Sequence, residues 1–155
     1  MTRQLQAEIK QGKPFQSPSA EALLSVLRTA AMLEHHLSEV LKPYGITHTQ
    51  YNVLRILRGA GSAGLCGREV GERLVSRVPD IPRLLDRMEE MQLIDRERDP
   101  ADRRHVTARI SAKGLKVLKQ ATPDLDVVER TRFAGLDPGR VKLLIEALAQ
   151  VRERL

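Results

Sequence analysis

Residues 77–114, RVPDIPRLLDRMEEMQLIDRERDPADRRHVTARISAKG, decide the fold of this chain. Asp80 can accept hydrogen bonds from the free N–H groups of a helical first turn. Pro82 falls inside that turn, where its missing N–H has no intrahelical partner to lose. Apolar residues then recur at a spacing of three and four, which predicts a helix over residues 80–91 with one buried face. This apolar stripe consists of Leu84, Leu85, Met88 and Met91.

After this helix the hydrophobic period changes to two. One alternating run begins at Ile94 and a second ends at Ile110, so we expect two strands. Between them lies the segment 99–104, Asp-Pro-Ala-Asp-Arg-Arg, whose proline and aspartates favour a tight turn. The order of elements therefore predicts a helix followed by a hairpin that carries Arg103 and Arg104 at its tip.

A helix beside an arginine-tipped hairpin suits duplex DNA, because the major groove admits a helix and the narrow minor groove attracts arginine. Arg83 is the candidate for base reading, since arginine can bind O6 and N7 of guanine together. A phosphate contact is its alternative. We expect Ser76 and Arg77 to contact phosphates. One of Arg103 and Arg104 is expected to enter the minor groove while the other pairs with an aspartate of the turn. The alternative for this turn is a solvated run of charge.

Several short pieces of the chain form one ordered pattern: Ile46-Thr47, Gln50-Tyr51, Val53-Leu54, residues 84–89, Leu93-Ile94, Asp99-Pro100, residues 102–104, Ile110-Ser111 and Gly114. This pattern resembles the signature of the MarR family of bacterial transcription regulators, over about residues 20–150. Three positions depart from the family pattern: Pro82 and Ser111 stand in place of threonine, and Cys66 in place of a serine or threonine cap.

The resemblance implies a winged-helix dimer built by its terminal helices. It also implies a small apolar or phenolic effector between the dimer region and the winged lobe, whose binding residues are unknown. In this family the position of Arg87 often has a structural role, here through pairing with Asp86 or Glu90. We nevertheless include Arg87 among the candidate DNA-binding residues.

Further helices are predicted at the two ends of the chain. Ser17 caps the first of them, and Pro18 occupies its first helical position. It continues for about six turns. Pro43 and Gly45 then stop it.

Two helices are expected after the hairpin. The first runs from Ala112 to about Ala134, and Pro123 must kink or interrupt it. The last begins with Asp137 as cap and Pro138 at the first position, and its apolar residues recur at a near-heptad spacing. The terminal helices together have more apolar surface than a small lobe can cover, which predicts an intertwined homodimer. The alternative is that the apolar residues of the last helix pack only within their own chain.

These elements predict a mainly α fold with a small β-hairpin wing, a winged helix-turn-helix flanked by N- and C-terminal dimerisation helices. Within the lobe, Thr47 and Gln50 form a capping box pattern, and Cys66 begins a short helix that continues to Leu74. The expected division is a flexible N-terminal arm or short extra helix at 1–16, an N-terminal dimerisation helix at 17–45, the winged lobe at 46–111 and C-terminal dimerisation helices at 112–155.

Composition narrows the class of partner. A net charge of +6 favours an anionic partner, although residues 65–110 contain ten arginines against ten acidic residues. Geometry must therefore separate the signs, with Asp86, Glu89 and Glu90 turned toward the protein or the rim. Aromatic residues make up only 3% of the chain, which argues against single-stranded nucleic acid. The chain has no apolar run long enough to span a bilayer and no signal-peptide pattern at its start, so we expect a cytoplasmic protein with no membrane partner.

The sequence gives little support for a disulfide bond, an oxidant sensor, a metal site or a catalytic site. A lone cysteine, Cys66, excludes an intramolecular disulfide, and we interpret it as a small capping residue rather than an oxidant sensor. His35 and His36 diverge on their helix, and His48 and His105 are distant in sequence, so we expect no metal and no cofactor. No catalytic motif is present, so we do not expect an enzyme.

The sequence therefore predicts a homodimeric, sequence-specific regulator of transcription that binds duplex DNA at a pseudo-palindromic operator. We expect a repressor that a small-molecule effector relieves. The alternative is a nonspecific architectural DNA-binding protein.

Overall fold

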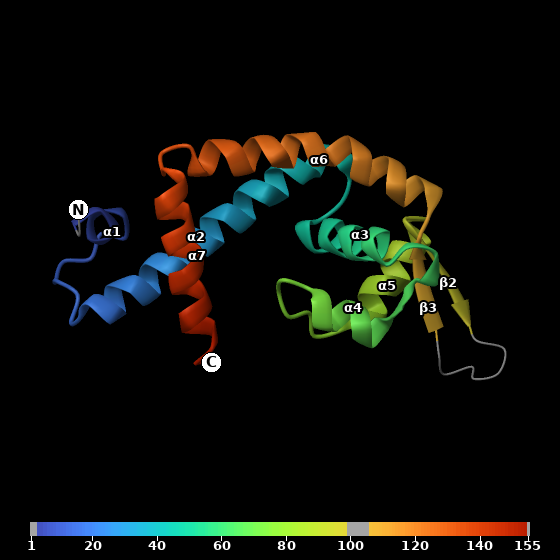
Figure 1. Cartoon of the computed structure of the whole chain (residues 1–155), viewed down its shortest axis with the longest axis horizontal. Coiled ribbons are helices and arrows are strands. Elements are labelled where there is room, and N and C mark those ends of the chain that lie inside the picture. The colour runs from blue at the N-terminus through green and yellow to red at the C-terminus, as the bar shows by residue number, and fades with distance from the viewer. Residues whose placement is uncertain (1–2, 99–105, 155) are drawn as a thin grey trace.

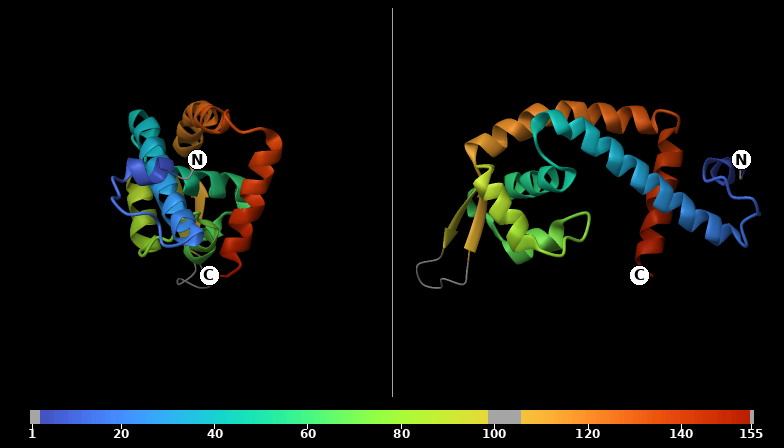
Figure 2. Two further views of the ribbon diagram at one scale, coloured as in Figure 1. Left: turned by 90° about the vertical axis from the view of Figure 1, so that its left-hand side faces the viewer. Right: turned by 180° about the vertical axis from the view of Figure 1, so that it is seen from behind.

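The computed structural model describes residues 3–98 and 106–154, and it shows an elongated molecule with a winged lobe at one end (Figure 1). The sheet lies at the end of the molecule opposite α1 and α7 (Figure 2). The helices are α1 (Arg3–Glu8), α2 (Pro18–Leu41), α3 (His48–Ala60), α4 (Gly67–Arg73), α5 (Ile81–Glu90), α6 (Ala112–Phe133) and α7 (Pro138–Arg152). The strands are β1 (Leu65–Cys66), β2 (Ile94–Arg98) and β3 (Val106–Ile110). This arrangement confirms the predicted winged helix-turn-helix fold.

Capping side chains begin the helices at the predicted residues. Ser17 Oγ accepts a hydrogen bond from the N–H of Ala20 at 3.1 Å. Thr47 and Gln50 form the expected reciprocal box, with distances of 2.9 and 3.2 Å between side-chain oxygen and backbone nitrogen. Asp137 Oδ1 caps α7 through the N–H of Arg140 at 3.0 Å. Local hydrogen bonding by these side chains is thus sufficient to locate the helix starts.

The sheet has three strands rather than the two that the sequence predicts. Strand β1 pairs antiparallel with β3, and the strand order is β1-β3-β2. Cys66 therefore lies in a strand, and it is also the N-cap residue of α4, as expected, so the first helical residue is Gly67. The backbone N–H of Cys66 donates to Glu69 Oε2 at 2.8 Å, which satisfies one free donor of α4. A strand of two residues is too short to show an alternating pattern, which explains why it was not predicted.

Two further expectations can be compared with the structure. Of the two forms expected for residues 1–16, the described part contains the short helix α1.

Pro123 lies inside a continuous helix, so it does not interrupt α6, and the ribbon of α6 curves along its length (Figure 1). A proline removes one backbone hydrogen bond and crowds the preceding turn, which favours bending.

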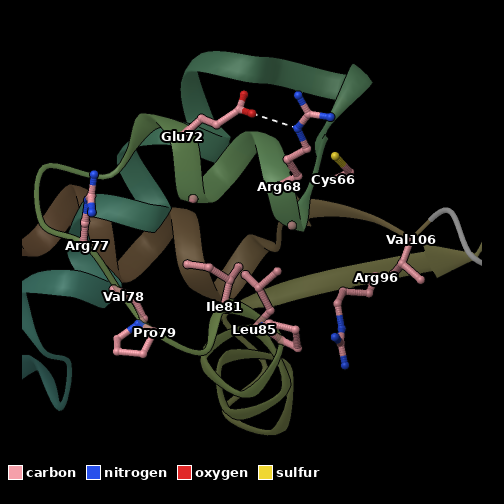
Figure 3. Close-up of a pocket in the computed structure, with 13 residues that line it drawn as sticks. Cys66, Arg68, Glu72, Arg77, Val78, Pro79, Ile81, Leu85, Arg96 and Val106 are labelled. Atoms are coloured by element: carbon pink, nitrogen blue, oxygen red, sulfur yellow. Dashed lines mark hydrogen bonds and ion pairs between the residues drawn. The ribbon is translucent and has the colours of Figure 1, made fainter.

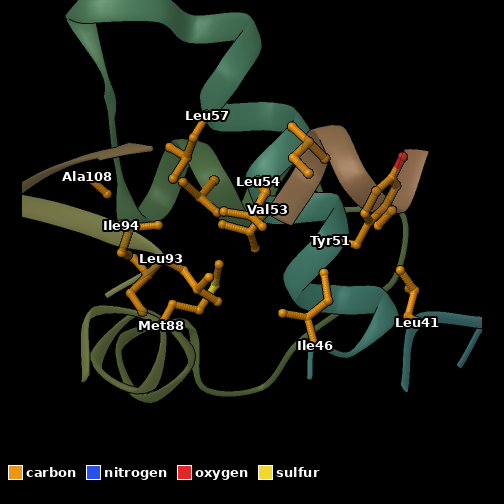
Figure 4. Packing of buried hydrophobic residues seen from close by; sticks show 14 of the residues in the cluster. Leu41, Ile46, Tyr51, Val53, Leu54, Leu57, Met88, Leu93, Ile94 and Ala108 are labelled. Carbon is orange, nitrogen blue, oxygen red and sulfur yellow. The ribbon is translucent and has the colours of Figure 1, made fainter. Parts of the chain in front are cut away.

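One hydrophobic core joins the lobe to the end of α2 and the first half of α6 (Figure 4). Helix α5 contributes Leu85 and Met88 of the predicted apolar stripe to this core. The other two residues of the stripe, Leu84 and Met91, are partly buried and pack against it. Helix α5 is therefore fixed to the lobe by its apolar face. The buried residues of this core are Leu41, Ile46, Tyr51, Val53, Leu54, Leu57, Leu65, Val70, Leu85, Met88, Leu93, Ile94, Ala108, Leu118, Ala121 and Leu125.

The helices at the other end have little cover. Helix α7 has no buried residue, and its Leu143 and Ile145 side chains are 65% and 60% exposed. Leu23, Leu27 and Met32 of α2 are also exposed. None of the helices in the described ranges is long and apolar enough to cross a membrane.

The junction between β3 and α6 is tightly packed against the turn that follows α5. Ser111 Oγ donates to the carbonyl of Gln92 at 2.7 Å and accepts from the N–H of Gly114 at 2.9 Å. A Cβ added at Gly114 would overlap the carbonyl oxygen of Leu93 and lie 3.1 Å from Leu54 Cδ2. Only glycine fits between α6 and this turn.

We therefore expect Gly114→Ala to lower the free energy of unfolding by about 2 kcal/mol, because the methyl group must displace backbone. Denaturant unfolding at a fixed protein concentration measures this change. Gly59→Ala is the matched control, since that glycine lies in α3 with nothing within 4 Å of an added Cβ. It should be neutral or stabilise by about 0.5–1 kcal/mol. Equal effects of the two substitutions would contradict the packing argument.

Candidate nucleic-acid interface

Helices α4 and α5 form the helix-turn-helix, and two glycines bring them close together. A Cβ at Gly71 would lie 3.2 Å from Ile81 Cγ1, and one at Gly67 would lie 3.6 Å from the side chains of Ile81 and Leu85. The link between the helices is held from α3, because Asn52 Oδ1 accepts a hydrogen bond from the N–H of Val75 at 3.0 Å. Ser76 and Arg77, the expected phosphate contacts, are exposed in this link.

Helix α5 is built as the sequence predicts. Asp80 Oδ1 accepts from the N–H of Arg83 at 2.9 Å, and Pro82 lies in the first turn. Arg83 and Arg87 are exposed, on a helix whose other face lies in the core. Their roles in binding DNA stay predictions, but their side chains are accessible to a ligand.

Two acidic residues of α5, Asp86 and Glu89, pair with Arg96 of β2 rather than with an arginine of α5 itself. Arg87 forms no ion pair with Asp86 or Glu90 within the described part of the chain, which corrects that expectation. Asp86 instead pairs with Arg96 of β2, whose Nη2 lies 2.6 Å from Asp86 Oδ1. The same guanidinium contacts Glu89 Oε2 through Nη2 at 2.6 Å and Nε at 2.8 Å.

Arg96 is thus a central residue that sequence reasoning did not single out. Its hydrogen bond to Glu89 raises the pKa of its guanidinium, burial lowers that pKa by a smaller amount, and Asp86 adds to the rise. The sequence does contain one indication of this role. Arg96 follows the buried Ile94 by two residues, so the two side chains lie on the same face of β2. As expected from the charge balance, Asp86 and Glu89 are held by the protein itself.

An open groove of about 930 Å³ lies between α4, the link, α5 and the sheet (Figure 3). Its apolar wall includes Ile81 and Leu85, and Arg77 and Arg96 lie at its edges. Cys66 also lines this groove and is half-buried. The groove adjoins the first turn of α5, so it belongs to the same surface as the expected DNA contacts.

The hairpin tip is only partly described. The pairing of β2 with β3 extends to Arg98 opposite Val106. Arg103 and Arg104 lie outside the described residues, and so do both aspartates of the turn, so their assignment to the minor groove stays a prediction.

A second cavity of about 280 Å³ lies between α2, α3 and α6. Around it, the Tyr51 hydroxyl contacts Thr122 Oγ1 at 3.1 Å, and His48 Nδ1 lies 2.8 Å from Glu34 Oε2. Sequence reasoning assigned no effector-binding residue here, because three helices distant in sequence contribute to the lining. The lining residues are Leu33, Leu37, His48, Tyr51, Arg55, Arg58, Thr122, Leu125, Asp126, Val128, Glu129, Arg132 and Phe133.

Two of the histidines, His36 and His48, have side-chain partners. His36 Nε2 lies 3.0 Å from Arg132 Nη2, and His48 is paired with Glu34. In residues 3–98 and 106–154 no group of three histidine, cysteine or acidic side chains could hold a metal ion.

Comparison with known proteins agrees with this geometry. The model of the MarR family matches residues 46–106. The transcriptional regulator HosA of Escherichia coli O111:H- is 30% identical over 121 residues, which cover 78% of this chain and 84% of HosA.

Two solved structures share the architecture. CouR from Rhodococcus jostii, bound to p-coumaroyl-CoA, aligns with a TM-score of 0.72 and 25% identity over 88% of this chain and 95% of CouR. The DNA complex of Staphylococcus aureus MepR shares the fold with a TM-score of 0.78 and 22% identity, over 92% of this chain and all of MepR. These matches, together with the fold, show that the chain is a DNA-binding transcriptional regulator and not an enzyme. The chain belongs to the MarR family.

Proposed function

We propose that this regulator is a homodimeric repressor that binds a pseudo-palindromic operator and is released by a small-molecule effector. The observation that carries the operator part of the proposal is the geometry of α5, which buries Leu85 and Met88 and leaves Arg83 and Arg87 exposed. A helix presented in this way can enter the major groove. Its target would be chromosomal DNA, so we also propose that it acts in the cytoplasm.

In this proposal Arg83 reads a base, and Arg87 lies one helical turn further along α5. Ser76 and Arg77 contact phosphates and fix the position of the lobe on DNA. One arginine of the hairpin tip, Arg103 or Arg104, enters the minor groove. The two-fold symmetry of a dimer places two copies of α5 in successive major grooves, about 10 base pairs apart.

Selection of bound duplexes from a random pool, at near-physiological salt, tests this function. We expect an enriched inverted repeat with half-sites one helical turn apart. Enrichment of no sequence despite retained binding would favour the architectural alternative.

The same selection with Arg83→Ala should give a relaxed preference at one position of each half-site, because one base contact typically contributes about 1–3 kcal/mol of discrimination. Lys10→Ala is the control, since it removes an exposed positive charge that lies outside both the helix-turn-helix and the proposed dimer helices. A preference equally sharp in Arg83→Ala and in the wild type would remove Arg83 from base reading.

The exposed apolar residues of α2 and α7 support the homodimer. These side chains are uncovered within one chain, and they lie at the end away from the winged lobe (Figure 1). Large apolar side chains that are left exposed together at one end of a molecule often mark an interface. We propose that helices 17–45 and 112–155 provide it.

Removal of residues 138–155 should therefore give monomers or insoluble protein in light-scattering measurements. A second variant, Leu143→Asp with Ile145→Asp, alters only side chains that are 65% and 60% exposed in one chain, so the protomer should stay folded. We expect this variant to be monomeric. A stable dimer in both variants would exclude the α7 interface.

The cavity between α2, α3 and α6 supports the effector part of the proposal. It lies where the proposed dimer helices meet the winged lobe, and it combines apolar side chains with Arg55, Arg58 and His48. Such a mixture suits a small molecule with an apolar body and a polar group. CouR, which shares the fold, is bound to p-coumaroyl-CoA.

Fluorescence anisotropy of a labelled operator can measure release by a panel of simple phenols, aromatic carboxylates and p-coumaroyl-CoA. We expect release by at least one compound, and we expect Leu37→Trp to abolish it by filling the cavity. DNA affinity without the compound should change little in this variant. Release that persists unchanged would place the effector site elsewhere.

A further inference from the structure

The acidic side chains of α5 present an electrostatic problem for a helix that approaches DNA. Within its ten residues α5 has two arginines and three acidic residues. Asp86 and Glu89 are 56% and 42% exposed, so their charges remain accessible to the field of a nearby phosphate backbone. Without compensation, these carboxylates would oppose the attraction of Arg83 and Arg87.

Arg96 supplies the compensation from a different element. Its guanidinium contacts both carboxylates at 2.6 Å, and only 22% of its side chain is exposed. These are charge-assisted hydrogen bonds, which are shorter and stronger than neutral ones. One cation on β2 therefore balances the charged side chains of α5 and holds Asp86 and Glu89 toward the sheet.

The strand fixes the position of this guanidinium. Arg96 lies opposite Ala108 of β3, which is buried, and it follows the buried Ile94 on the same face. Residues on the other face make a separate pair, in which Arg109 Nη1 contacts Glu97 Oε2 at 2.7 Å. Arg96 and Arg109 thus form their ion pairs on opposite faces of the sheet, and of the two only Arg96 pairs with residues of α5.

We propose that Arg96 is a positioning residue for DNA binding, which neutralises Asp86 and Glu89 and so allows α5 to approach the phosphate backbone. This inference rests on the proposed entry of α5 into the major groove. Arg96 acts through the helix, and it does not itself contact a base.

The test compares four full-length proteins in anisotropy titrations with the selected operator, over a range of salt concentrations. Arg96→Gln should weaken binding by roughly tenfold at low salt, because two uncompensated carboxylates then face phosphates. The loss should shrink as salt rises, since salt screens exposed charges.

A purely structural role for Arg96 predicts a different result in the rescue variant. Addition of Asp86→Asn and Glu89→Gln to Arg96→Gln removes the repulsion but does not restore any ion pair. We expect the triple variant to bind within about threefold of wild type or more tightly, because α5 then has more arginines than acids. A triple variant as weak as Arg96→Gln would overturn the proposal.

Arg109→Gln is the matched control, since it removes the same charge from the same sheet but from the pair with Glu97. It should change the affinity by less than about twofold at low salt. A loss equal to that of Arg96→Gln would show that net charge alone is responsible, which also overturns the proposal.

A further variant keeps the inference testable if Arg96→Gln does not fold. Asp86→Asn with Glu89→Gln, in the presence of Arg96, should bind DNA as tightly as wild type or more tightly. A folded double variant that binds more weakly contradicts the proposal. If the wild-type protein binds no duplex, the proposed function itself fails, whereas unchanged binding by Arg96→Gln removes only this inference.

Discussion

The close approach of Gly114 to the carbonyl of Leu93 is the contact on which the arrangement of this molecule depends. It brings the first turn of α6 against the turn between α5 and β2, and Ser111 adds two hydrogen bonds at the same place. Helix α5, the sheet and the long helix α6 therefore meet within a few residues. A larger side chain at this position would separate all three.

This junction gives α6 a direct packing contact with the turn at the end of α5. Further along, α6 contacts the lobe again through Thr122, which meets Tyr51. It also contacts the turn that follows α2 through Asp124, which accepts a hydrogen bond from the Tyr44 hydroxyl. That bond raises the pKa of Tyr44. The second cavity lies along the same helix, so a ligand that shifted α6 would act on an element fixed to the end of α5. Coupling between sites requires such an element with two arrangements.

The parts of the fold that the sequence predicted are those with local signals. Asp80, Thr47 and Gln50 bond to backbone within three residues, and the two long strands show their alternation without reference to a partner. Pairings between distant segments were not predictable in this way. Strand β1 is defined by its pairing with β3, some forty residues later. Arg96 became important only when the fold brought two carboxylates of α5 to it, and the cavity residues come from three separate helices.

The contact of Gly67 and Gly71 with Ile81 has a consequence for the thermodynamics of binding. A Cβ at Gly71 would lie 3.2 Å from Ile81 Cγ1 and one at Gly67 would lie 3.6 Å from Ile81 and Leu85, so α4 packs closely on the first turn of α5. The helix-turn-helix therefore reaches its target already ordered, and association does not have to fix the angle between α4 and α5. A flexible pair of helices would lose conformational entropy on binding, and a rigid pair avoids this cost, which favours higher affinity. A rigid pair also cannot adapt to a groove of the wrong shape, which favours selectivity.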